Sequence, residues 1–298
     1  MYPGEFDYHE AESVDHALEL MDEHSGAETE LLAGGHSLLP TMKSGLADPD
    51  VVIDIGDIDA LSGIDDHGDS VSIGATTTYA TIADSETVWN AAPALADAAA
   101  HVGDRQVRNC GTIGGNIAHA DPASDLPGAA LASDATMTVT GQGGKREVDA
   151  DDFFMGMYMT DVQPGELLTR VEVPKAEEGA GAYAKKPSPS SGYAMVGVAA
   201  TLRTDGDTVQ SAGVGANGAM DHGVRLGPVE DALSGVSLDD EDAMAEAASR
   251  ATDDLDTAMM MEDIQASADF RAHLLEVYTE RALATAADRA GGSAAAGD

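Results

Sequence analysis

Two short glycine-containing segments carry the residue types best suited to binding an anionic ligand. The first, LLAGGHSLLP, covers residues 31–40, and the second, VGDRQVRNCGTIGGNIAHADPASDLP, covers residues 102–127. Glycine lets a backbone approach a ligand closely, and successive N–H groups can point together at an anion. Together the segments suggest a diphosphate held mainly by backbone amides, which suits a chain with only 15 lysine and arginine residues.

In the first segment, an apolar strand runs into the pair Gly34-Gly35, and a helix begins near Ser37. The N-terminus of a helix carries a partial positive charge that attracts anions. Ser37 could either cap this helix or donate a hydrogen bond to a phosphate oxygen. Taken alone, the segment fits an ordinary strand–helix connection better than a phosphate site.

The second segment repeats the theme with Gly114-Gly115, flanked by Thr112 and Asn116, whose side chains can both donate hydrogen bonds. Neither segment has the GxxxxGK[ST] pattern of a P-loop, and no GxGxxG sequence follows a strand. The P-loop and the Rossmann dinucleotide-binding motif are therefore excluded as interpretations.

Composition limits the possible partners. Fifty-four acidic residues against 15 basic ones give a formal net charge of −39, and the acidic residues are spread along the chain. We interpret this as adaptation to a salt-rich cytoplasm, where salt screens the self-repulsion; specific cation binding is the alternative. Nucleic acid is not an expected partner, because its phosphate backbone requires a basic footprint.

The single cysteine, Cys110, excludes an internal disulfide and is too few for an iron–sulfur cluster. We expect an inert, packed thiol rather than a redox group. The N-terminal residues show no secretory signal, and no apolar run of about 18 residues occurs. The sequence thus predicts a soluble cytoplasmic protein without a transmembrane segment.

Hydrophobic patterning predicts an α+β fold, because strands and helices mix without a steady βαβ alternation. Residues 14–21 have helical spacing, and strands are expected up to Ala33 and over 51–55, 61–64, 71–74, 137–140 and 167–173. A helix should begin at Pro93, followed by a long loop over residues 103–125. A strand meander over 182–185, 194–202 and 209–214, with a turn at Asp205-Gly206, precedes a helix around residues 270–278.

The motifs, in their order and spacing, resemble the FAD-binding medium subunits of aerobic carbon monoxide dehydrogenase and the flavin domains of xanthine dehydrogenases. The resemblance rests on AGGHSLLPTMKSGLADPDVVIDI, IGATTTYATI and VRNCGTIGGNIAHADPASDLPGAALASDA. It continues through AYAKKPSPSSGYAMVGVAA and DFRAHLLEVYTERAL, so it covers nearly the whole chain.

The resemblance implies a noncovalently bound FAD and assigns roles to matching positions. The FAD diphosphate would lie between two loops, made of Ala33, Gly34, Gly35, His36, Ser37 and Leu38 and of Thr112, Ile113, Gly114, Gly115 and Asn116. Asp125 would accept hydrogen bonds from the FAD sugar hydroxyls, or cap the helix that starts at Leu126. Leu168, Lys185 and Tyr193 would lie near the flavin ring.

Each of these last positions has an alternative. Leu168 and Tyr193 fit core positions as well, and Lys186 competes with Lys185 for the place beside the ring. His36 occupies a turn in which some flavin oxidases attach FAD covalently, but the rest of the chain does not follow that pattern. His101 and His119 are expected to be loop histidines with satisfied hydrogen bonds, and no metal site is expected.

The resemblance also implies a domain plan and a function. An FAD-binding domain of the vanillyl-alcohol-oxidase or PCMH type would span residues 1–176, with subdomains 1–55 and 56–176. A C-terminal flavoprotein domain of antiparallel sheet and helices would span 177–290, before a flexible tail, 291–298.

The implied chain is an oxidoreductase subunit without catalytic side chains. Electrons would pass from a molybdenum–pterin large subunit through an iron–sulfur small subunit to FAD, and then to a quinone or NAD. The partners could form a carbon monoxide or a xanthine/aldehyde-type dehydrogenase. A nucleotide-binding module without redox turnover and a stand-alone FAD oxidoreductase are the rival interpretations.

Overall fold

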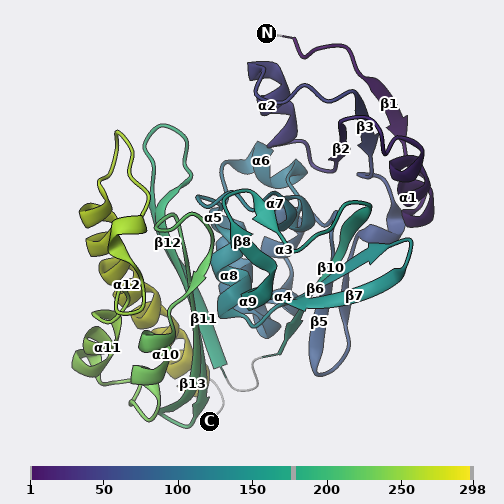
Figure 1. The fold of residues 1–298 in the computed structure, drawn as a ribbon. Coiled ribbons are helices and arrows are strands. Elements are labelled where there is room, and N and C mark those ends of the chain that lie inside the picture. The colour runs from purple at the N-terminus through teal and green to yellow at the C-terminus, as the bar shows by residue number, and fades with distance from the viewer. Residues whose placement is uncertain (1, 176–178, 296–298) are drawn as a thin grey trace.

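The computed structural model describes residues 2–175 and 179–295, which form three consecutive units (Figure 1). A small N-terminal unit lies at one end, a sheet with helices lies in the middle, and a second sheet with its own helices completes the molecule. The α+β fold class with an antiparallel C-terminal sheet is confirmed. The boundary expected at residues 176–177 lies outside the described residues.

The first unit is a three-stranded parallel sheet in which β3 lies between β1 and β2. Ser13 caps α1 by accepting a hydrogen bond from the His16 N–H. The predicted helix and two strands are confirmed, whereas β1 was not expected from the sequence. Its elements are β1 (Asp7–Glu10), α1 (Val14–Glu23), β2 (Thr29–Leu32), α2 (Leu38–Ser44) and β3 (Val51–Asp54).

The second unit is built on an antiparallel sheet of order β4-β5-β10-β6-β7. The strand expected over 61–64 is instead a 3₁₀ turn followed by β4. The elements up to the second glycine loop are η1 (Asp59–Leu61), β4 (Ile64–Asp66), β5 (Ser70–Gly74), α3 (Tyr79–Ala83), α4 (Glu86–Ala91), α5 (Pro93–His101) and α6 (Arg105–Cys110). The rest are α7 (Ile113–His119), α8 (Leu126–Ala132), β6 (Thr136–Gly141), β7 (Gly144–Asp149), α9 (Ala150–Phe153), β8 (Phe154–Gly156), β9 (Met159–Thr160) and β10 (Glu166–Pro174).

The prediction of a long loop over residues 103–125 is wrong, because most of that segment forms α6 and α7. Asp104 caps α6 by accepting from the Val107 N–H, and Thr112 caps α7 by accepting from the Gly115 N–H. Both helices are only six or seven residues long, and α6 buries none of its residues. They therefore lack the apolar periodicity by which helices are recognised in a sequence.

The third unit is an antiparallel sheet of order β11-β12-β13-β14, covered on its outer face by helices (Figure 1). The meander and the Asp205-Gly206 turn are confirmed. Its elements are β11 (Gly179–Pro187), β12 (Ala194–Asp205), β13 (Thr208–Asn217), β14 (Val224–Arg225), α10 (Gly227–Leu233), α11 (Glu241–Ala248), η2 (Thr257–Met259) and α12 (Ala268–Ala295). The tail expected from residue 291 is helical as far as Ala295, and residues 296–298 lie outside the described part.

Helices α5 and α8 join the second and third units, because they pack on β11 and β13 of the C-terminal sheet. The buried carboxylate of Asp97 in α5 strengthens this junction. It accepts hydrogen bonds from the Tyr183 N–H at 3.0 Å and from Arg289 of α12 at 2.8 Å. One side chain thus ties a helix of the second unit to a strand and a helix of the third.

The described residues contain neither a membrane-spanning helix nor a metal-binding cluster. No helix within 2–175 and 179–295 combines the length and apolar character needed to cross a membrane. In the same ranges, no group of three or more histidine, cysteine, aspartate or glutamate residues is arranged to hold a metal ion.

Candidate functional site

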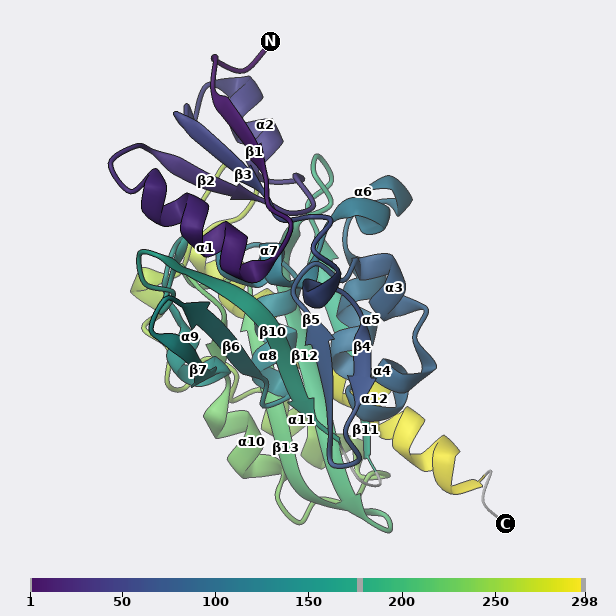
Figure 2. The ribbon, with the colours of Figure 1, turned by 90° about the vertical axis from the view of Figure 1, so that its right-hand side faces the viewer.

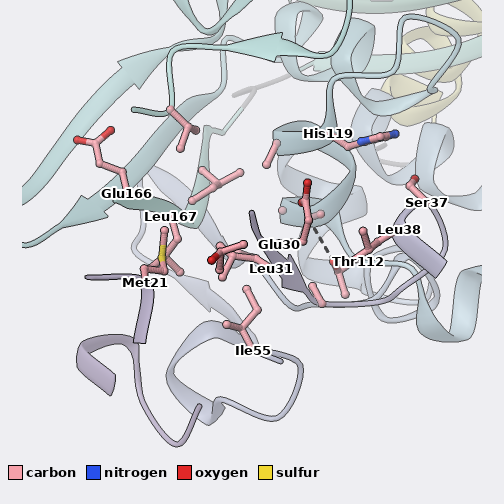
Figure 3. A pocket seen from close by; sticks show the side chains of 18 of the residues that line it. Met21, Glu30, Leu31, Ser37, Leu38, Ile55, Thr112, His119, Glu166 and Leu167 are labelled. Atoms are coloured by element: carbon pink, nitrogen blue, oxygen red, sulfur yellow. Dashed lines mark hydrogen bonds between the residues drawn. The ribbon is translucent and has the colours of Figure 1, made fainter. Parts of the chain in front are cut away.

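A cleft of about 1630 Å³ lies between the first and second units, and both glycine loops open onto it (Figure 3). Clefts that hold drug-sized ligands have volumes of roughly 300–1,000 Å³. This one is larger, and residues of α1, β2, α7 and β10 line it. The cleft therefore joins segments that lie more than 100 residues apart in the chain.

The first glycine loop connects β2 to α2 and presents free backbone donors. Gly35 has φ +70°, a left-handed conformation that glycine adopts without strain. Among the described residues, no protein acceptor receives the N–H groups of residues 34–37. The Ser37 hydroxyl does not cap α2 and instead faces the cleft, where it contacts the Tyr193 hydroxyl. Such a loop can bind an anion through its main chain.

The two loops meet at Gly34. A side chain there would overlap the carbonyl oxygen of Cys110 and the Cα atom of Gly111, which immediately precede the second loop. Only glycine permits this backbone-to-backbone approach. Gly34 therefore sets the distance between the two sides of the cleft.

The second loop differs from the expectation of a second set of free amides. The Ile113 and Gly114 N–H groups donate to the carbonyls of Thr77 and Ala75, and the Gly115 N–H donates to Thr112 Oγ1 at 3.2 Å. The first N–H groups of α7 are thus already bonded within the protein. This loop instead contributes the helix dipole, a bare surface at the exposed Gly115, and side chains.

Two polar atoms in the cleft lining lack a partner among the described residues. Asn116 donates from Nδ2 to the Tyr79 hydroxyl at 3.0 Å, while its Oδ1 atom is buried without a hydrogen bond. Thr76 Oγ1 is buried without a partner as well. Buried polar groups are nearly always hydrogen-bonded in native proteins, so these atoms fit a cleft that binds a polar ligand.

The structure brings most of the predicted binding residues to this cleft. Ile113, Asp125 and Lys185 do not line it: Ile113 is fully buried in the core, and the other two form a buried pair behind the cleft. The predicted residues that do line it are Ala33, Gly34, Gly35, His36, Ser37, Leu38, Thr112, Gly114, Gly115, Asn116, Leu168 and Tyr193.

Asp125 and Lys185 are joined by an ion pair, in which Lys185 Nζ lies 2.9 and 3.1 Å from the two carboxylate oxygens. The Tyr183 hydroxyl donates to the same carboxylate at 2.6 Å. Burial raises the pKa of Asp125, and the Lys185 ammonium opposes that rise. The alternative role of Asp125 as a helix cap is wrong, because its side chain makes no capping hydrogen bond to α8.

Lys185, rather than Lys186, is the lysine that points inward. Its Nζ atom also donates to the Gly192 carbonyl at 3.1 Å, which fixes the segment leading to Tyr193. Tyr193 lines the cleft, is 42% exposed, and its hydroxyl interacts with Ser37 of the first glycine loop. The buried pair is thus connected to the cleft through this segment.

Several features of the cleft are not predicted by the sequence patterns. His119 lies at the end of α7, not in a loop, and its ring packs 5.1 Å from that of Tyr158. Tyr158 has φ +56°, and its N–H donates to the carbonyl of Ala120. The run MGMYMT gave no clear strand pattern, so the β8–β9 hairpin that carries Tyr158 was not predicted.

Cys110 also departs from its prediction, because it is exposed rather than packed. The physical reason is that α6 buries none of its side chains. His36 is exposed as well, and its Nε2 atom lies 3.5 Å from the Gln106 carbonyl of the same helix.

His101 should make stability depend on pH. Its Nδ1 atom lies 3.2 Å from Asp97 Oδ1, and this interaction raises the pKa of His101 above its ordinary value of 6.5. A raised pKa gives a stabilisation that is complete below pH 6.5 and is lost as the pH rises through the pKa of the folded state. The midpoint of thermal unfolding should therefore exceed that of His101→Gln at pH 6, and the two should converge by about pH 9.

The matched control is His273→Gln, which alters an exposed histidine on α12. Its midpoint should differ from the unmodified protein by the same amount at every pH. A constant difference for His101→Gln as well would contradict the assignment.

Two family models together match most of the chain. Residues 4–176 match the model described as FAD binding domain in molybdopterin dehydrogenase, and residues 181–286 match the CO dehydrogenase flavoprotein C-terminal domain. The carbon monoxide dehydrogenase medium chain of Hydrogenophaga pseudoflava is 37% identical over 284 residues, which are 95% of this chain and 97% of that one. The glyceraldehyde dehydrogenase medium chain of Sulfolobus acidocaldarius is 35% identical, with coverage of 95% and 99%.

A solved structure agrees with these matches. Carbon monoxide dehydrogenase from Hydrogenophaga pseudoflava, in a form lacking the Mo-pyranopterin moiety, superposes with a TM-score of 0.89 at 36% identity, covering 97% of this chain and 99% of that one. The family models together with these relatives confirm the resemblance read from the sequence. The chain therefore belongs to the family of FAD-binding medium subunits of molybdenum hydroxylases.

Proposed function

We propose that this chain binds FAD noncovalently in the cleft and serves as the electron-transfer subunit of a molybdenum hydroxylase. The observation that carries the proposal is the meeting of the two glycine loops at the cleft, one with free N–H groups and the other at the start of a helix. FAD supplies the exchange between single electrons and electron pairs. The protein acts by binding and orienting the cofactor, without a catalytic side chain.

The roles of the lining residues follow from their positions. The free N–H groups of residues 34–37 and the Ser37 hydroxyl would hold the diphosphate from one side. The dipole of α7 and the Asn116 side chain would face it from the other. Leu168 and Tyr193 would contact the ring, and Asp125 and Lys185 would support it from behind the cleft wall.

The partners are proposed from the relatives. Those relatives are medium chains or subunits, which supports a complex with an iron–sulfur small subunit and a molybdenum–pterin large subunit. Their names specify different substrates, carbon monoxide and glyceraldehyde, and this supports a substrate site on the large subunit. Reduced FAD would pass its electrons to a quinone or to NAD.

The charge supports a salt-rich, cytoplasmic setting. A net charge of −39 over 298 residues repels itself strongly unless salt screens it. At 1 M salt the screening length is about 3 Å, shorter than most distances between neighbouring surface charges. The protein is therefore best assayed in molar potassium chloride.

The test is the cofactor content of the complex, expressed with its partner chains and purified in molar potassium chloride. We expect one FAD per chain, released by acid precipitation, and loss of the flavin absorbance bands when the complex is reduced. Iron and molybdenum should copurify. Absence of FAD would instead support a nucleotide-binding module, and FAD without iron or molybdenum would support a stand-alone oxidoreductase.

A further inference from the structure

Three surface segments without a single acidic residue meet at one end of the molecule. They are residues 39–46 in and after α2, residues 105–110 of α6, and residues 187–193 between β11 and β12. The chain as a whole carries 54 acidic residues in 298. We call these three segments the acid-free face.

The structure holds the three segments together through the first glycine loop. His36, just before α2, contacts the Gln106 carbonyl of α6, and Ser37 interacts with the Tyr193 hydroxyl. Both ribbon views show α2, α6 and the loop after β11 at the same end of the molecule (Figures 1 and 2). The face therefore combines segments from all three units at one end of the molecule.

The acid-free face exposes apolar and basic side chains. Leu46 is 81% exposed, Tyr193 is 42% exposed and Leu39 is 38% exposed. Lys43 and Arg105 are exposed and have no ion-pair partner among the described residues. An apolar centre with aromatic and arginine residues is the composition typical of protein interfaces.

Repulsion of the FAD diphosphate does not account for the whole face. Such repulsion explains the absence of acidic residues from the part of the face that lines the cleft. Residues 105–110 do not line the cleft, so it does not explain their lack of acidic residues. A solvent-exposed α6 would gain from the same acidification as the rest of the surface. A face covered by a partner would not, because a buried unpaired carboxylate is destabilising.

We infer that the acid-free face is the docking surface for the iron–sulfur subunit, an inference that rests on the proposed function. The face is continuous with the flavin site through Ser37 and Tyr193, where an electron donor must approach. Lys43 and Arg105 fit an acidic rim on that partner. Met42 and Ser188 are buried, and the other 19 residues of the face approach the roughly 20–30 residues per side of a standard interface.

The test reverses two charges that lie outside the cleft. In the complex expressed with its partner chains, Lys43→Glu/Arg105→Glu should weaken retention of the iron–sulfur subunit by about tenfold or more. Retention is measured as the iron-to-flavin ratio after gel filtration at several protein concentrations. The flavin content per chain should stay unchanged, which shows that the variant has folded.

The matched control makes the same charge change away from the face. Arg250→Glu/Arg281→Glu alters Arg250 after α11 and Arg281 on α12, and it should retain iron as the unmodified chain does. Loss of molybdenum with iron retained, a change only in self-association, or no difference between the two double variants would each overturn the inference. An unmodified complex that lacks FAD or an iron–sulfur chain would instead contradict the proposed function.

Discussion

Gly34→Ala should nearly abolish FAD binding. The added methyl group would overlap the Cys110 carbonyl and the Gly111 Cα atom, both of them backbone, so neither can rotate away. The two sides of the cleft would have to separate, at a cost of about 2–3 kcal/mol by analogy with other overpacked sites. If that strain falls on the bound form, the affinity for FAD drops roughly 100-fold. The loss of affinity is measured as the flavin content per chain after gel filtration and as the dissociation constant for FAD in a fluorescence titration.

Gly26→Ala is the matched control, because a methyl group at Gly26 would meet no atom within 4 Å and its φ is not positive. That variant should keep its full flavin content. A Gly34→Ala chain that binds FAD with unchanged affinity would show that the contact between the loops does not set the cofactor site.

Lys185→Met should cause the largest loss of stability among single substitutions in this region. It leaves the Asp125 carboxylate without its cation, although both side chains are almost fully buried. Removing one partner of a buried ion pair typically costs about 3–5 kcal/mol. Burial already raises the pKa of Asp125, and loss of the Lys185 ammonium should raise it further in the variant. Denaturant unfolding at fixed salt measures the loss.

Two further variants separate the contribution of the Asp125–Lys185 ion pair from other effects of the substitution. Lys186→Met removes a charge from the adjacent residue, which has no ion-pair partner among the described residues, and should change stability little. Asp125→Asn combined with Lys185→Met should recover part of the lost stability, because no charge then remains buried without a partner. Equal losses for Lys185→Met and Lys186→Met would show that the ion pair does not stabilise the fold.

The sequence was most informative where local patterns determine local structure. The strand, Gly34-Gly35 turn and helix near Ser37 follow from apolar spacing and glycine placement, and all three are present. It was least informative where distant segments meet. Asp125 and Lys185 are 60 residues apart, and they meet only because α5 and α8 pack on the C-terminal sheet. Likewise, Tyr158 owes its left-handed backbone to a hydrogen bond with Ala120, which no local pattern reveals.

The second glycine loop shows a different kind of error. Gly114-Gly115 was correctly placed at the cleft, but its amides were assumed to face a ligand. In the structure Gly114 instead lies against the backbone of Ala75, where a side chain would overlap. Glycine allows both the close approach of a ligand and the close packing of a helix. The amino-acid sequence alone does not distinguish these two uses.

The shared helices α5 and α8 also bear on how such chains evolve. The two matched family regions meet near residue 180, yet they are not interchangeable parts. Strands β11 and β13 pack against helices α5 and α8, which belong to the N-terminal matched region. Arg289 donates a hydrogen bond to Asp97, which lies 192 residues earlier in the chain. Recombination between relatives at that boundary would preserve both domains and still separate residues that contact each other across it.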